Sequence, residues 1–186
     1  MVSILGLSGS LRKGSYNSHL LRNAVDLAPA NCEIVVKSIR EVPLYDGDVE
    51  SSLGIPKAAT ELKDALAAAK GLLLVTPEYN NSVPGVLKNT IDWMSRPSSD
   101  IERVFKDKPV ALLGASPGPG GTRFAQVAWL PVFRTLGMRP WFGGTFYLDR
   151  AQNTISETGD ISDEKMKLRI KQFLEGFVAF IETQNR

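Results

Sequence analysis

The sequence predicts an α/β protein in which a parallel sheet is covered by helices on both faces. Short apolar runs alternate along the chain with segments whose apolar residues repeat at helical spacing. Such alternation is typical of βαβ units, which are joined by right-handed crossovers. The runs 72–75 and 110–113 are apolar at every position, as in strands that are buried on both faces. We therefore expect a doubly wound, three-layer parallel sheet.

The length and composition fit one domain, which we expect to span residues 1–186. The chain has a mass of 20.3 kDa, and 43% of its residues are hydrophobic, so it can bury a substantial core. Its net charge is only +2, and its cations are scattered, which excludes the basic patch of a nucleic-acid-binding protein. No leader-like or membrane-length apolar segment is seen, so we expect a cytoplasmic protein and no membrane partner.

Each predicted element follows from a local pattern. The helix at the start of the chain, for example, has Leu20, Leu21, Ala24 and Val25 on one face. The segment 40–55 is the longest connection before a helix and is a candidate lid or interface loop. The predicted strands are 2–7, 33–39, 71–76, 110–115 and 141–148, and the predicted helices are 17–28, 56–69, 84–95, 121–137 and 163–183.

The loop after the first strand predicts an anion site. Residues 7–18 read L-S-G-S-L-R-K-G-S-Y-N-S and lead from a buried strand into a helix. Free backbone N–H groups and the positive end of the helix dipole meet at such a point, and Arg12 adds a formal charge. Lysine is missing where a Walker A loop needs it, and the glycine spacing does not fit a dinucleotide fingerprint. The loop suits a single terminal phosphate; the alternative is an ordinary turn with Ser15 as helix cap.

Two further loops follow the third and fourth predicted strands. Residues 76–85 read T-P-E-Y-N-N-S-V-P-G, and residues 116–123 read S-P-G-P-G-G-T-R. Ligands of open α/β sheets bind outside the carboxyl ends of the strands, where the strand order reverses. With the strand order 2-1-3-4-5, that point lies between the first and third strands. All three loops then border one crevice.

The second loop indicates a planar, hydrogen-bonding ligand. Pro77 fixes the chain as it leaves the strand, so the backbone amides of Glu78, Tyr79 and Asn80 can face the edge of a ring. The glycines of the third loop allow a flat ring to approach the backbone. One phosphate and one flat ring describe FMN better than ATP or NAD. Tyr79 as a packing residue and Glu78 as a solvated charge remain alternatives.

Three ordered motifs resemble one known family. G-S-L-R-K-G-S-Y-N at 9–17, P-E-Y-N at 77–80 and K-N-T-I-D-W at 88–93 are similar to the NADPH-dependent FMN reductase family. That family is flavodoxin-like and includes quinone, azo-dye and chromate reductases. The resemblance implies an oxidoreductase in which FMN takes hydride from NADPH or NADH and passes electrons to a quinone, an azo compound, free flavin or a metal oxyanion. It implies these cofactor-binding residues: Ser10, Arg12, Ser15, Asn17 and Ser18 for the phosphate, and Pro77, Glu78, Tyr79, Asn80, Ser116, Gly118 and Gly121 for the ring.

The resemblance also implies a homodimer or a dimer of dimers. Helix 84–95 carries Leu87, Ile91, Trp93 and Met94, more apolar surface than one sheet face requires, and segment 124–136 is a second candidate interface. The alternative is that both helices are buried within one chain.

No side chain is predicted to act as a catalytic acid or base, and no metal site is predicted. His19 is the only histidine and has no evident partner, and the lone Cys32 lies in an apolar run. A rival function is an electron carrier like flavodoxin without NAD(P)H activity, although such carriers are typically strongly acidic. A second is a protein that delivers flavin to a monooxygenase.

Overall fold

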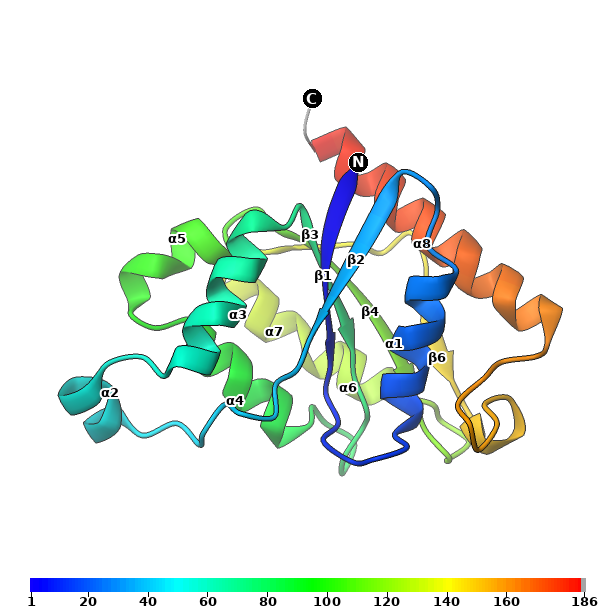
Figure 1. Ribbon diagram of the computed structural model, residues 1–186, viewed down its shortest axis with the longest axis horizontal. Helices are drawn as coiled ribbons and strands as arrows, with labels where there is room; N and C mark the ends of the chain where they lie inside the picture. Colours follow the sequence, from blue (N-terminus) through cyan, green and yellow to red (C-terminus); the bar gives the residue numbers. More distant parts are fainter. Residues whose placement is uncertain (185–186) are drawn as a thin grey trace.

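The computed structural model describes residues 1–184 and has three layers (Figure 1). All strand pairs in the sheet are parallel, and the first four strands have the order β2-β1-β3-β4, as predicted. In Figure 1, α3 and α4 lie on one side of the sheet, and α1 and α8 lie on the other. The strands are β1 (Val2–Ser8), β2 (Cys32–Lys37), β3 (Gly71–Val75), β4 (Pro109–Ala115), β5 (Arg139–Pro140) and β6 (Phe146–Leu148). The helices are α1 (Tyr16–Asp26), α2 (Gly47–Leu53), α3 (Lys57–Ala68), α4 (Gly85–Met94), α5 (Ile101–Val104), α6 (Arg123–Ala128), α7 (Leu130–Thr135) and α8 (Glu164–Gln184), with short 3₁₀ turns at Ser98–Asp100 and Ala151–Asn153.

Each face of the sheet has its own hydrophobic core. On one face, α1 and α8 pack against side chains such as Ile4 and Leu73. On the other face, α3, α4 and α7 pack against Leu5 and Leu74. Neighbouring residues of β1 therefore point into opposite cores, which explains why these strands are apolar at every position.

The predicted fifth strand, 141–148, is wrong in its boundaries. Two short strands take its place beside β4: β5 pairs with the start of β4, and β6 pairs with its end. Between them the chain leaves the ladder, because the Trp141 ring packs against Phe173 and Phe177 of α8. A Cβ atom on Gly143 would lie 2.4 Å from Trp141 Nε1, so the neighbouring backbone needs glycine to pass the ring.

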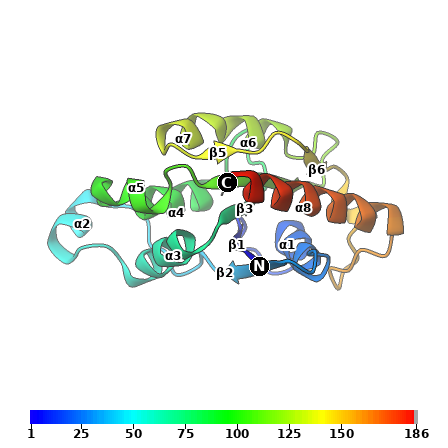
Figure 2. The same cartoon turned by 90° about the horizontal axis from the view of Figure 1, so that it is seen from above.

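The predicted helix 121–137 is two helices, α6 and α7, with Trp129 between them. Pro131 is near the start of α7 and has no N–H to donate to the preceding turn, so a continuous helix would lose a hydrogen bond there. Figure 2 shows both helices beside β5, away from α1.

The apolar surface that was expected to be in surplus on α4 is not exposed. Its apolar residues Leu87, Ile91, Trp93 and Met94 are all buried within the chain. Part of the cover comes from the segment before α2: Trp93 Nε1 donates to the Pro43 carbonyl at 2.9 Å. The candidate lid segment 40–55 thus includes α2 and is fastened over α4.

Candidate functional site

The loop between β1 and α1 presents unpaired backbone donors at the carboxyl edge of the sheet. Ser15 is the N-cap of α1, and its hydroxyl accepts a hydrogen bond from the Asn17 N–H at 3.2 Å. Within residues 1–184, the backbone N–H groups of Leu11, Lys13, Gly14 and Tyr16 make no hydrogen bond. These donors, together with the start of the helix, form a site for an anion.

Arg12 supplies the formal charge of this loop. Its side chain is exposed and lies over the Tyr16 ring, with 5.7 Å between the guanidinium carbon and the ring centre. No carboxylate in the described part of the chain pairs with Arg12. The charge is therefore available to a ligand.

Gly9 brings the loop between β1 and α1 (residues 9–15, the phosphate loop) against the loop between β3 and α4 (residues 76–84, the ring loop). Its N–H donates to the Val75 carbonyl at 2.9 Å. A Cβ atom on Gly9 would lie 2.9 Å from Pro77 and from Leu87, and 3.0 Å from Pro84, all closer than ordinary contact. Only glycine allows the two loops to meet this closely.

The ring loop is a rigid turn. Tyr79 and Ser82 form an antiparallel bridge through two hydrogen bonds, and Asn80 and Asn81 between them have φ angles of 50° and 58°. Two central residues with positive φ define a type I′ turn, and asparagine tolerates this conformation. The N–H of Tyr79 is used by the bridge, so of the three amides predicted to face a ring, those of Glu78 and Asn80 lack a protein partner in residues 1–184.

Glu78 fastens the ring loop to α6. One oxygen of its carboxylate accepts hydrogen bonds from the backbone N–H groups of Phe124 and Ala125, at 2.8 and 3.0 Å. These are first-turn donors of α6, where a negative charge is favourable. The Glu78 side chain therefore caps α6 with this oxygen.

The third loop (residues 116–122) follows β4 and lines the same cavity as the phosphate loop and the ring loop. Ser116 accepts a hydrogen bond from the Gly118 N–H at 3.1 Å, which tightens the turn. Gly121 has a φ of +62° and packs on the backbone of Tyr147. At the root of the loop, a Cβ atom on Gly114 would lie 1.9 Å from the Thr122 hydroxyl, so the loop folds back directly over the strand.

The three loops enclose a cavity of about 300 Å³. Of the predicted site residues, the structure brings together Ser10, Arg12, Ser15, Asn17, Pro77, Glu78, Tyr79 and Ser116 around it. Ser18, Asn80, Gly118 and Gly121 lie outside this lining. The lining also includes Tyr16, Ala115 and Pro117, which were not predicted. Tyr16 lies inside the quoted motif, between the serine cap and Asn17, so its position was the available signal.

The residues present fit a flavin monophosphate. The donors of 11–16 and the Arg12 cation suit one phosphate, and the close approach at Gly9 leaves no room for a side chain between phosphate and ring subsites. A planar ring fits between the ring loop and Ser116–Pro117, which face each other across the cavity.

The remaining chemistry-bearing residues do not form a second centre. Within the described chain, no group of three histidine, cysteine, aspartate or glutamate side chains is arranged to hold a metal ion. The His19 ring lies against Gly159, and burial, followed by the nearby Arg22 charge, lowers its pKa. Within residues 1–184, no helix is long and apolar enough to cross a membrane.

Comparisons with known proteins identify the family. Residues 2–153 match the family model described as NADPH-dependent FMN reductase. An NAD(P)H-dependent FMN reductase of Pseudomonas aeruginosa is 41% identical over 180 residues, covering 97% of this chain and 95% of the relative. A quinone reductase of Escherichia coli is 35% identical, covering 97% of this chain and 96% of the relative. The solved structure of FerB, a flavoenzyme NAD(P)H:(acceptor) oxidoreductase from Paracoccus denitrificans, superposes with a TM-score of 0.87 at 31% identity and 98% coverage of both chains.

Proposed function

The chain belongs to the NADPH-dependent FMN reductase family, and on that premise we propose that it is an FMN-dependent NAD(P)H oxidoreductase that reduces quinones. The observation that carries the proposal is the row of unpaired N–H groups beside Arg12, at the end of a cavity of about 300 Å³ flanked by two rigid loops. One phosphate subsite and one flat subsite match a mononucleotide flavin. Azo compounds, free flavin and metal oxyanions are further acceptors that such an enzyme can reduce.

The residues of the cavity have distinct roles in this proposal. Ser10, Arg12 and the amides between Lys13 and Tyr16 hold the phosphate, and the ring lies between Pro77–Tyr79 and Ser116–Pro117. When bound, FMN supplies the redox chemistry: it accepts hydride from NAD(P)H and gives electrons to the acceptor. Among the cavity residues, the one carboxylate, Glu78, is engaged by two backbone donors. The chain thus positions the reactants and shields them from water, and no side chain needs to exchange a proton.

We further propose that the protein forms a homodimer or a dimer of dimers. A dimer of dimers needs two separate self-complementary surfaces. The exposed large apolar side chains of residues 1–184 include two such groups: Leu44 and Leu53 on the segment over α4, and Val127 and Phe142 beside α6 and α7. Val127 and Phe142 line one groove, which supports an interface there.

The assembly is tested by light scattering on the double variant Val127→Glu, Phe142→Glu. Phe142 is 71% exposed, so the fold tolerates the change. We expect a dimer to become a monomer, or a dimer of dimers to become a dimer, with the flavin content retained. The reason is that carboxylates then face each other across the two-fold axis. A wild-type protein that is monomeric at micromolar concentration contradicts the proposal.

Since NAD(P)H is an intracellular reductant, we propose a cytoplasmic location.

The function is tested on the purified protein. Acid-released cofactor is separated by chromatography, and oxidation of NADPH and NADH is followed with menadione as acceptor. We expect FMN and menadione-dependent oxidation. Released FAD, or tight ATP binding without flavin affinity, contradicts the flavin assignment. Bound FMN with no NAD(P)H oxidation indicates an electron carrier instead.

A further inference from the structure

One edge of the sheet is formed by β2, which pairs with a single strand. β2 joins β1 in a parallel ladder, and no strand of residues 1–184 lies on its other side. Figure 2 shows β2 at the border of the molecule, between α1 and α3. Because the Val2 N–H donates to the Asn31 carbonyl, the odd-numbered residues of β2 turn their backbone groups toward β1. The backbone N–H and carbonyl groups of Ile34 and Val36 therefore point to the open side, where a further strand can bind them.

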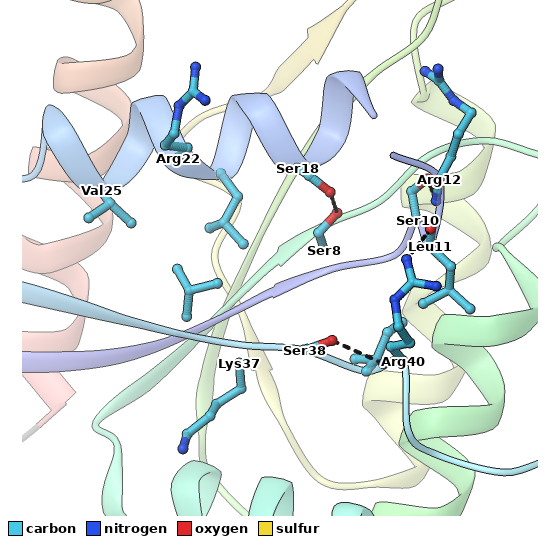
Figure 3. A pocket seen from close by; sticks show the side chains of 13 residues that line it. Ser8, Ser10, Leu11, Arg12, Ser18, Arg22, Val25, Lys37, Ser38 and Arg40 are labelled. Carbon is cyan, nitrogen blue, oxygen red and sulfur yellow. Dashed lines mark hydrogen bonds between the residues drawn. The ribbon is translucent and has the colours of Figure 1, made fainter. Parts of the chain in front are cut away.

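Two neighbouring valines of this edge strand are exposed on opposite faces. Val35 is 38% exposed and Val36 is 50% exposed. Val36 and Val25 of α1 line a groove of about 470 Å³ between α1 and β2. Figure 3 shows that the next residue, Lys37, points away from Val25, on the other side of β2. Side chains alternate along a strand, so Glu33, Val35 and Lys37 share the face that is turned away from α1.

The charges on that face are arranged symmetrically about Val35. Glu33 lies two residues before Val35 and Lys37 lies two residues after it, and both charged side chains are exposed. Neither makes an ion pair or a side-chain hydrogen bond within residues 1–184. They cannot pair with each other, because four residues of a strand span about 13 Å. A two-fold axis through Val35 places Glu33 opposite the partner's Lys37, and Lys37 opposite the partner's Glu33.

We propose that the β2 edges of two copies of this chain pair antiparallel about a two-fold axis at Val35 and join the two sheets into one. In this register Ile34 lies opposite the partner's Val36, and the outward backbone groups of these residues exchange hydrogen bonds. Val35 lies opposite the partner's Val35 in a pair without hydrogen bonds, where side chains approach most closely. A shift of the register by two residues would place Val35 opposite a charge and separate both ion pairs. The backbone and the side chains thus select the same register.

This inference goes beyond the proposed function, because neither flavin nor reductant takes part in the contact. It supplies the second self-complementary surface that a dimer of dimers needs. The first surface, the groove that includes Val127 and Phe142, lies beside β5 and β6. The strand order places β2 and β5 at opposite edges of the sheet, so both surfaces can be used at once.

Charge reversal tests the register. The variants are Glu33→Lys, Lys37→Glu and the double variant with both changes. Each is made in the flavin-loaded protein that also carries Val127→Glu and Phe142→Glu, so that only the β2 contact remains. Sedimentation equilibrium measures the Kd of the dimer. We expect each single variant to raise the Kd about tenfold or more, because two ion pairs become two repulsive pairs, and the double variant to restore it. Lys171→Glu, which reverses an exposed charge on α8, is the matched control and leaves the Kd unchanged.

Disulfide formation tests the position of the two-fold axis. Val35→Cys and Val36→Cys are compared, each with Cys32→Ser, by oxidation with copper phenanthroline and a non-reducing gel. We expect a covalent dimer of Val35→Cys, because residues that face each other in a pair without hydrogen bonds have Cα atoms about 4.5 Å apart, within reach of a disulfide. Val36→Cys is the matched control, since Val36 lies opposite Ile34 of the partner subunit and not opposite its own copy.

Three results overturn the proposal. They are single charge reversals that leave the Kd unchanged, a double reversal that associates as weakly as the single ones, and equal cross-linking at positions 35 and 36. A protein with Val127→Glu and Phe142→Glu that is monomeric at high micromolar concentration overturns it as well.

Discussion

The side-chain amide of Asn17 exchanges two hydrogen bonds with the backbone of Ala115. Asn17 Nδ2 donates to the Ala115 carbonyl at 2.8 Å, and the Ala115 N–H donates to Asn17 Oδ1 at 2.9 Å. Asn17 lies in the first turn of α1, and Ala115 is the last residue of β4. The pair therefore joins the phosphate loop to the third loop, 98 residues away along the chain. Asn17, predicted as a phosphate contact, uses its side chain for this link.

Replacing Asn17 by alanine should destabilise the fold by about 2–4 kcal/mol, because it leaves a buried donor and a buried acceptor of Ala115 unpaired. Asn89→Ala is a matched control. Its amide also makes two backbone hydrogen bonds, to Tyr45 N–H and Pro43 carbonyl at 2.8 Å each, but they are exposed. Water can replace the lost partners there, so the loss should be below about 1 kcal/mol. Urea unfolding measures the free energy of unfolding of both variants. Equal losses of stability in Asn17→Ala and Asn89→Ala contradict this account.

Gly9→Ala should cost about 1–3 kcal/mol and lower the FMN affinity. The added methyl group would overlap Pro77, Leu87 and Pro84, and the two loops must move apart to admit it. Gly85→Ala, at the start of α4, is the control: a Cβ atom added there would have no atom within 4 Å, and alanine favours the helix. It should be neutral or slightly stabilising. Thermal unfolding compares the stability of the two variants, and flavin fluorescence titration compares their affinity for FMN. A Gly9→Ala protein as stable as Gly85→Ala contradicts the prediction.

The sequence was sufficient to predict the layers and the strand order, because the strands are apolar at every position and the helices have one apolar face. It was not sufficient to predict the excursion at Trp141, which depends on packing against α8. The break before α7 was missed although Pro131 was its signal in the sequence. Nor could α4 be assigned correctly from its apolar content alone. The extra apolar surface of α4 is covered by the segment around Pro43, whose carbonyl accepts a hydrogen bond from Trp93, 50 positions away along the chain.

In the site, the backbone features were predictable and several side-chain roles were not. The anion site follows from a strand, a small-residue loop and a helix start, and the structure has that arrangement. The roles of Asn17 and Glu78 depend on partners in β4 and α6, far along the chain. A polar residue in a binding motif looks the same in the sequence whether it contacts the ligand or holds the loop that does.

Arg12→Ala should weaken FMN binding by about 1–3 kcal/mol, the magnitude of a charge-assisted hydrogen bond to a partly buried anion. Riboflavin lacks the phosphate, so its affinity should hardly change. Fluorescence titration of the apoprotein with both flavins measures the difference. Because Arg12 is exposed and has no carboxylate partner in residues 1–184, the fold should be unaffected. Equal losses for FMN and riboflavin indicate that Arg12 supports the loop instead.

Cys32 should react slowly with thiol reagents in the folded protein. Burial, with a smaller effect of the Glu33 charge, raises the pKa of its thiol from 9.0 to about 11. The thiolate is the reactive form, so at pH 8 its fraction is roughly 100-fold lower than in an ordinary thiol. Alkylation by iodoacetamide, followed by mass spectrometry, should accelerate by about that factor in urea. The rate in the folded protein should rise about tenfold per pH unit up to pH 10; a rate that levels off below pH 9 contradicts the raised pKa.

Glu78→Ala should weaken FMN and riboflavin binding by similar factors, in contrast to Arg12→Ala. The carboxylate holds the ring loop to the first turn of α6 through two backbone donors, at 2.8 and 3.0 Å. Its removal should cost about 1.5–3 kcal/mol of stability, and Glu78→Gln, which keeps an acceptor without the charge, should cost less. Hydrogen exchange at Phe124 and Ala125 should accelerate in the same order. A loss of affinity confined to FMN would mean that Glu78 acts on the phosphate subsite, and unchanged exchange at both amides would mean that the cap does not hold the loop in solution.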